Sequence, residues 1–117
     1  MSGYKAIFFE KENGTAPAED FLETLDDKMN AKMVRAISAL QENGPQLREP
    51  YSKHLDDGIF ELRAQVGSNL SRVIYFFYTK KRIILTHGFV KKTQKTPKSE
   101  IAKAKIYRKE YLARGEE

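Results

Sequence analysis

The sequence contains no cysteine and no tryptophan, and only two of its 117 residues are histidine. Without cysteine the chain cannot form a disulfide, a thiolate metal site or a cysteine nucleophile. The two histidines, His54 and His87, lie in no HExxH or similar ligand pattern, and no glycine-rich phosphate loop is present. We therefore expect no metal site and no other cofactor.

Long apolar runs are missing as well. No stretch approaches the roughly 20 residues that cross a bilayer, and the apolar run before Glu10 is shorter than the core of a signal peptide. We therefore expect a cytoplasmic protein that does not engage a membrane. Seven phenylalanines and six tyrosines supply one hydrophobic core, so residues 1–117 are predicted to form a single domain.

Charge is unevenly distributed along the chain. Up to Leu62 there are seven Lys and Arg against twelve Asp and Glu, a net −5, and after Leu62 there are fourteen against four, a net +10. Clustered cations attract phosphates, so the second half predicts a polyanion or an acidic protein as partner. The alternative is a basic surface that is merely solvated.

The first half predicts a strand followed by helical structure. Residues 4–9 are rich in aromatic and branched side chains, and residues 17–40 carry apolar side chains at helical spacing, with Thr15 or Ala16 as the expected N-cap. Asp26-Asp27 could begin a second helix and so create a helical hairpin, which Gly44-Pro45 would end. Residues 45–58 show no period and are interpreted as a loop.

The second half predicts three strands and a helix. Residues 59–65, 71–78 and 83–90 read as strands joined by short polar turns, the last two apolar on both faces. Thr96, as N-cap before Pro97, predicts a final helix that extends to Tyr111 or Leu112. The order βααβββα indicates an α+β fold with a small antiparallel or mixed sheet, an N-terminal helical hairpin on one face and a C-terminal helix.

Cations recur on the three predicted strands. Arg63 lies on the first, Arg72 on the second, and Lys91-Lys92 follows the third. If these strands are neighbours, the cations can surround a phosphodiester group, which an arginine fork binds bidentately. RNA carries its own nucleophile, the 2′-hydroxyl, so such a site needs only charge stabilisation and proton exchange. The alternative for either arginine is an ion pair with a carboxylate of this region, namely Glu61, Asp56 or Asp57.

The two histidines differ in their predicted roles. His54 is the candidate for proton exchange, because imidazole titrates near neutrality and the predicted loop that holds it, with Lys53 beside it, precedes the Arg63 strand. An exposed loop histidine without a role is equally compatible with the pattern. His87 alternates with apolar strand residues, which favours a buried, structural histidine.

Three segments of the second half resemble the RelE/ParE toxin superfamily, specifically its phage Gp49-like HigB branch: IFELR at 59–63, SRVIYFF at 71–77 and HGFVKKTQKTP at 87–97. The likeness extends from the first strand to the terminal helix, where Glu100-Ile101-Ala102 and Ala104 match. It implies the same βααβββα fold. It also implies that the chain is the toxin of a type II toxin–antitoxin pair.

This resemblance implies a ribosome-dependent, metal-independent endoribonuclease that cleaves mRNA. Arg72 falls on the family arginine of the Arg-Val-x-Tyr strand, Arg63 on the basic residue that ends the Leu-Arg motif, and Lys92 on the basic position after the last strand. The predicted catalytic residues are these three together with His54. The predicted RNA contacts are Lys53, Lys91, Lys95 and Lys98. The implied partners are mRNA, the ribosome and a small helix-turn-helix antitoxin, through which alone the toxin would reach operator DNA.

Two other functions remain open on the sequence alone. A ParE-like inhibitor of DNA gyrase has the same fold and no nuclease activity. A non-catalytic nucleic-acid-binding module would use the same cations for affinity only, with graded and salt-sensitive losses when single cations are removed.

Overall fold

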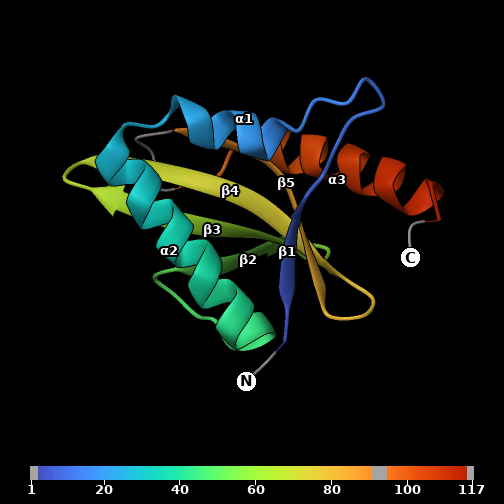
Figure 1. Cartoon of the computed structure of the whole chain (residues 1–117), viewed down its shortest axis with the longest axis horizontal. Helices are drawn as coiled ribbons and strands as arrows, with labels where there is room; N and C mark the ends of the chain where they lie inside the picture. The colour runs from blue at the N-terminus through green and yellow to red at the C-terminus, as the bar shows by residue number, and fades with distance from the viewer. Residues whose placement is uncertain (1–2, 91–94, 116–117) are drawn as a thin grey trace.

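The computed structural model describes residues 3–90 and 95–115. Within these residues, five strands form one sheet and three α-helices pack on it (Figure 1). The elements in chain order are β1 Lys5–Phe8, α1 Pro17–Thr24, α2 Asp27–Asn43, a short 3-10 turn Gly44–Gln46, β2 Ser52–Asp56, β3 Ile59–Val66, β4 Asn69–Tyr78, β5 Arg82–Val90 and α3 Lys98–Ala113.

The sheet is mixed, with the strand order β1-β5-β4-β3-β2. β1 runs parallel to β5, and the other neighbours are antiparallel, so the three strands predicted from residues 59–90 do lie side by side. Of the three inner strands, β4 and β5 are apolar on both faces, because each face is covered by helix. The predicted α+β class is confirmed.

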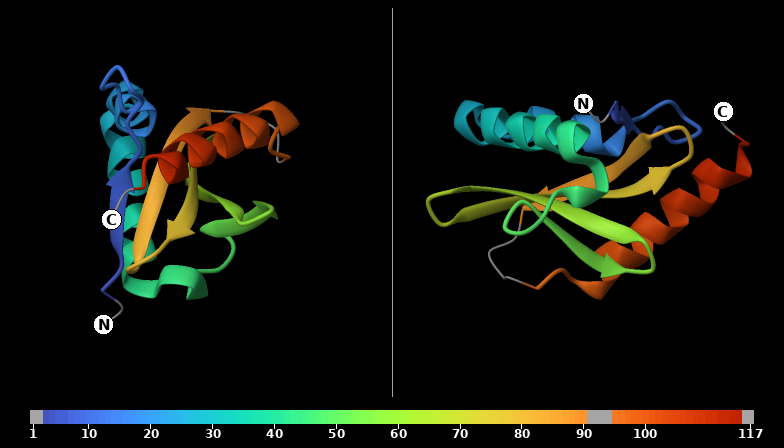
Figure 2. Two further views of the ribbon diagram at one scale, coloured as in Figure 1. Left: turned by 90° about the vertical axis from the view of Figure 1, so that its right-hand side faces the viewer. Right: turned by 90° about the horizontal axis from the view of Figure 1, so that it is seen from below.

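The helices lie on opposite faces of the sheet. α1 and α2 cover one face and α3 covers the other (Figure 2). Met33, Leu40 and Tyr75 belong to the hydrophobic cluster under the helical hairpin, whereas Ile74 and Ala104 belong to the cluster under α3. Successive residues of one strand, here Ile74 and Tyr75, therefore enter different clusters, as the period of a strand requires.

The helix ends follow the signals in the sequence. Ala16 is the N-cap of α1 with Pro17 in its first turn, and Gly44 caps α2. The Asp26 side chain accepts a hydrogen bond of 2.8 Å from the Met29 N–H, which satisfies one of the free donors at the start of α2. The helical hairpin predicted as one of two possibilities is confirmed.

Two expectations about local structure are wrong. Part of the predicted loop, residues 52–56, is the edge strand β2. Its side chains are mainly polar because an edge strand exposes much of its surface, so neither helical spacing nor alternation marks it. Thr96 does not cap α3, since Pro97 is the N-cap residue and the Thr96 hydroxyl donates to the Glu61 carboxylate instead. Among the described helices, none is long and apolar enough to cross a membrane.

Candidate functional site

The three neighbouring strands bring the predicted arginines together. Arg63 on β3 lies directly opposite Arg72 on β4, and Arg72 lies opposite Phe89 on β5. Glu61 stands two residues before Arg63 and therefore shares its face of the sheet, the face that α3 covers. The strand register thus gathers two cations and one carboxylate on this face.

A buried carboxylate links the two arginines. The fully buried Glu61 accepts a hydrogen bond of 2.5 Å from Arg63 Nε, and its Oε1 lies 3.7 Å from Arg72 Nε. Thr96 Oγ1 donates a further hydrogen bond to Glu61 Oε1. Two guanidinium groups directly opposite each other on a sheet repel, and Glu61 compensates that repulsion while leaving one positive charge in excess.

Arg72 and Arg63 differ in exposure. Arg72 has a relative exposure of 0%, and this burial lowers the pKa of its guanidinium, a shift that the attraction of Glu61 opposes. The Arg63 side chain is 16% exposed and reaches the surface. Arg63 is therefore placed to touch a ligand, whereas Arg72 is placed to hold Glu61 and, through it, Arg63.

Arg63 opens into a pocket of about 580 Å³ between β2 and the start of α3. Three cations line it, Lys53 from β2, Arg63 from β3 and Lys95 from the segment before α3, and we call it the basic pocket. Lys53 and Lys95 are exposed. Glu49 is the one carboxylate among its described lining residues, so the pocket suits an anion.

His54 lies at the edge of the basic pocket. It is opposite Phe60 across β2 and β3, and the centres of the two rings are 5.0 Å apart. Its Nε2 accepts a hydrogen bond of 3.2 Å from the Gly58 N–H in the turn between these strands. That bond requires an unprotonated Nε2, which leaves Nδ1 as the atom that carries the proton of the neutral ring.

His87 lies on β5 and is only 4% exposed. Its Nε2 is 2.9 Å from Glu100 Oε1 on α3, and its Nδ1 is 3.1 Å from Thr86 Oγ1. Burial lowers the pKa of His87, against the hydrogen bond and the charge of Glu100, which raise it. The burial and these partners agree with the structural role that the sequence favours, since the imidazole connects α3 to the sheet.

The remaining predicted residues fall into two groups. Lys98 is the first residue of α3, is exposed and does not line the basic pocket. Lys91 and Lys92 lie outside the described residues. In the part of the chain that is described, no three His, Asp or Glu side chains gather in a way that could hold a metal ion.

Sequence reasoning named Glu61 as a possible ion-pair partner of the two arginines, which the structure confirms, but it did not make Glu61 part of the site, and it missed Thr96. The signal for Glu61 was present, because a carboxylate between the apolar residues Phe60 and Leu62, on the face of Arg63, needs a cation when it is buried. Thr96 gave no comparable signal. A threonine before proline is typical of a helix start, and only the packing of that segment against β3 gives it a different partner.

Comparison with known proteins identifies the family. The sequence model of the family described as Phage derived protein Gp49-like (DUF891) matches residues 20–109, which include the later part of α1, all of α2, strands β2 to β5 and most of α3. The chain belongs to this family, which is the RelE/HigB-like toxin family. No curated protein matches the sequence significantly. Family membership suggests the toxin of a toxin–antitoxin system.

Proposed function

We propose that this chain is a ribosome-dependent, metal-independent endoribonuclease that cleaves mRNA and thereby inhibits translation. The observation that carries the proposal is the basic pocket, in which Arg63, Lys53 and Lys95 surround one cavity while the buried Glu61 orients Arg63. A guanidinium held in one direction binds two phosphate oxygens with little loss of freedom, and the lysines add charge on either side.

The proposed reaction uses the 2′-hydroxyl of the RNA as nucleophile. Its oxygen attacks the adjacent phosphorus and the bond from phosphorus to the 5′ oxygen breaks, which leaves a 2′,3′-cyclic phosphate and a 5′-hydroxyl. Arg63 stabilises the charge that develops on the phosphate oxygens. His54 is the proposed proton carrier, because it is the one imidazole among the described residues that line the pocket. Its Nε2 would exchange the Gly58 N–H for the proton of the 2′-hydroxyl and would then return that proton to the departing 5′ oxygen.

The other predicted residues take supporting roles in this proposal. Arg72, which was predicted as catalytic, becomes a positioning residue that pairs with Glu61 and so holds Arg63 in place. Lys98 lies within one helical turn of the pocket residue Ile101 and can contact a longer RNA. Lys92 as a catalytic cation and Lys91 as an RNA contact stay predictions.

The cellular setting is part of the same proposal. Residues 1–117 would act as one toxin domain in the cytoplasm, and a small helix-turn-helix antitoxin would bind and neutralise it. The toxin would approach operator DNA only within that complex. Membership of the family supports an antitoxin as partner, since the toxins of this family typically pair with one.

Primer extension on a defined mRNA tests the proposal. With translating ribosomes, the protein should create new 5′ ends within codons, and these ends should accept a phosphate from a polynucleotide kinase because they are hydroxyls. Ends that already carry a phosphate would contradict the 2′-hydroxyl mechanism. If no new ends form with or without ribosomes, the nuclease is excluded, and DNA cleavage by gyrase and simple RNA binding are the activities to measure next.

A further inference from the structure

A second cavity lies beside the basic pocket. It is a groove of about 760 Å³ between α2 and β3, and its floor is aliphatic. The floor residues are Ala36 and Ala39 of α2, Leu47 and Pro50 of the following segment, Ala64 of β3 and Leu70 of β4. We call it the α2–β3 groove. An open aliphatic surface of this kind favours burial against another apolar surface.

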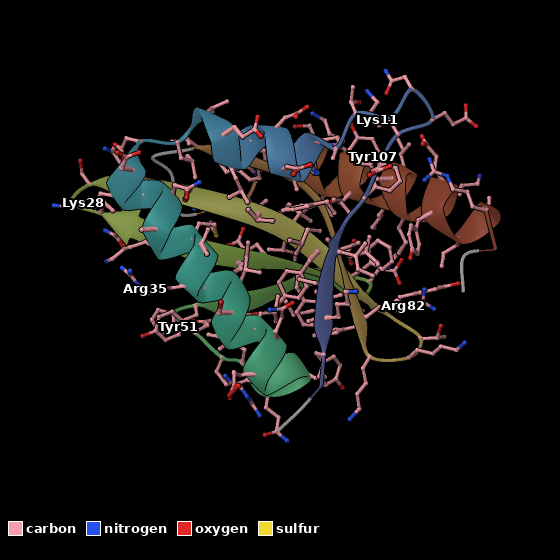
Figure 3. All side chains as sticks on the ribbon, viewed as in Figure 1. Lys11, Lys28, Arg35, Tyr51, Arg82 and Tyr107 are labelled. Atoms are coloured by element: carbon pink, nitrogen blue, oxygen red, sulfur yellow. The ribbon has the colours of Figure 1, made fainter. Side chains whose placement is uncertain are left out.

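The rim of the groove is positively charged. Lys32 and Arg35 border it from α2 and Arg63 borders it from β3, and no carboxylate belongs to the lining among the described residues. The Lys32 ammonium donates a hydrogen bond of 2.8 Å to the Gln65 carbonyl and so fixes one side of the rim. Figure 3 shows Arg35 on α2 and Tyr51 before β2 on the same side of the molecule.

The groove also runs along an open edge of the sheet. β2 pairs with β3 only as far as Leu62, and the Arg63 N–H donates to the Tyr51 carbonyl at 2.8 Å. Beyond this point residues 64–66 have a strand partner on the β4 side alone within the described sheet. A segment of another protein can therefore approach this part of β3 without displacing a strand.

We propose that the α2–β3 groove binds an acidic amphipathic segment of a partner protein. Its apolar side chains would cover the aliphatic floor, and its carboxylates would face Lys32 and Arg35. The positive rim favours a negatively charged partner. The aliphatic floor favours a protein segment over RNA, because proteins bind the bases of single strands by stacking them on aromatic side chains. Tyr51 is the one aromatic side chain among the described residues that line the groove.

The groove and the basic pocket share Arg63. Its side chain pairs with Glu61 on the α3 face, so a segment in the groove would lie at the edge of the basic pocket, and its negative charge would oppose RNA binding there. This consequence rests on the proposed function, whereas the docking itself does not.

Fluorescence anisotropy with a labelled amphipathic peptide of leucine and glutamate tests the docking. The wild-type chain should bind this peptide and should not bind its leucine and lysine analogue. Replacing both Lys32→Glu and Arg35→Glu should weaken binding about tenfold or more, because several attractive pairs become repulsive. Ala39→Glu should weaken binding of the peptide to a similar extent, because it places a charge on the aliphatic floor of the groove. Lys28→Glu is the matched control on the same helix, outside the groove lining, and should bind as the wild type does.

Three results would overturn the proposal. The peptide could fail to bind, it could lose as much affinity with Lys28→Glu as with the rim variants, or Ala39→Glu could abolish binding of a single-stranded oligoribonucleotide instead. Either of the first two results would mean that the peptide is attracted only by the net charge of the protein. The third result would mean that RNA, and not a protein segment, binds in the α2–β3 groove. Inhibition is read separately as displacement of an oligoribonucleotide from the wild-type chain. If mRNA is not cleaved but the peptide binds as described, the proposed function fails and the docking stands.

Discussion

At the scale of the residue, the main feature is the buried Glu61 with an arginine on each side. A carboxylate out of contact with water stays charged only where cations and hydrogen-bond donors replace the solvent, and here Arg63, Arg72 and Thr96 supply them. Within this group Arg72 is fully buried, whereas the Arg63 side chain is partly exposed and lines the basic pocket. The two arginines therefore differ in what their removal does.

Arg72→Ala should lower the free energy of unfolding by about 3–5 kcal/mol, because it leaves Glu61 with one cation fewer and opens a space in the sheet. Denaturant unfolding followed by circular dichroism measures this effect. Lys109→Ala, at an exposed position of α3, is the control and should stay within about 0.5 kcal/mol of the wild type. An Arg72→Ala protein as stable as the control would show that the buried ion pair does not contribute.

His87 gives a prediction about pH. Because burial lowers its pKa below the ordinary value of 6.5, the unfolded chain takes up the proton first as the pH falls. The free energy of unfolding should therefore be highest above about pH 6.5 and decline below it. The decline should be smaller in His87→Gln, measured by denaturant unfolding at a series of pH values. An equal decline in both proteins would contradict a buried neutral His87.

At the scale of the element, the sequence predicted every helix and strand that carries a hydrophobic pattern. The strand β2 was not predicted from the sequence. It is held in place by pairing with β3 and by the hydrogen bond of 2.6 Å between Ser52 and Tyr75, and no local sequence pattern reveals these contacts. For the candidate site, the alignment of Arg63 with Arg72 followed from the predicted strands. The burial of Arg72 did not, since it depends on how α3 and Thr96 close over the sheet.

The packing of α1 on β5 depends on one small residue. A Cβ at Gly88 would lie 2.2 Å from Cδ2 of the Phe21 ring, so Gly88→Ala must displace that ring or the helix. We expect a loss of about 1–3 kcal/mol in the free energy of unfolding. Phe21→Leu placed in the same chain should recover part of that loss, because it removes the clashing ring atoms. Additive losses in the double variant would contradict this contact.

At the scale of the whole molecule, the opposite charges of the two halves of the sequence are partly joined in space. Lys105 and Arg108 of α3 pair with Asp56 and Asp57 at the turn between β2 and β3, at 2.6 and 2.9 Å. These contacts hold α3 to the edge of the sheet. The basic pocket gathers Arg63, which pairs with Glu61, together with Lys53 and Lys95 around one cavity, and this directs the polyanion hypothesis to these three residues.

The most direct test of the account compares mRNA cleavage by the wild type, Arg63→Ala and Lys109→Ala in primer extension with translating ribosomes. Loss of a donor that stabilises the transition state lowers a rate by about 10²–10³-fold, so Arg63→Ala should cut at least this much more slowly while Lys109→Ala cuts as the wild type does. The unfolding midpoint of each variant must show that it is folded. Cleavage by a folded Arg63→Ala protein at the wild-type rate would contradict the basic pocket as the site of reaction.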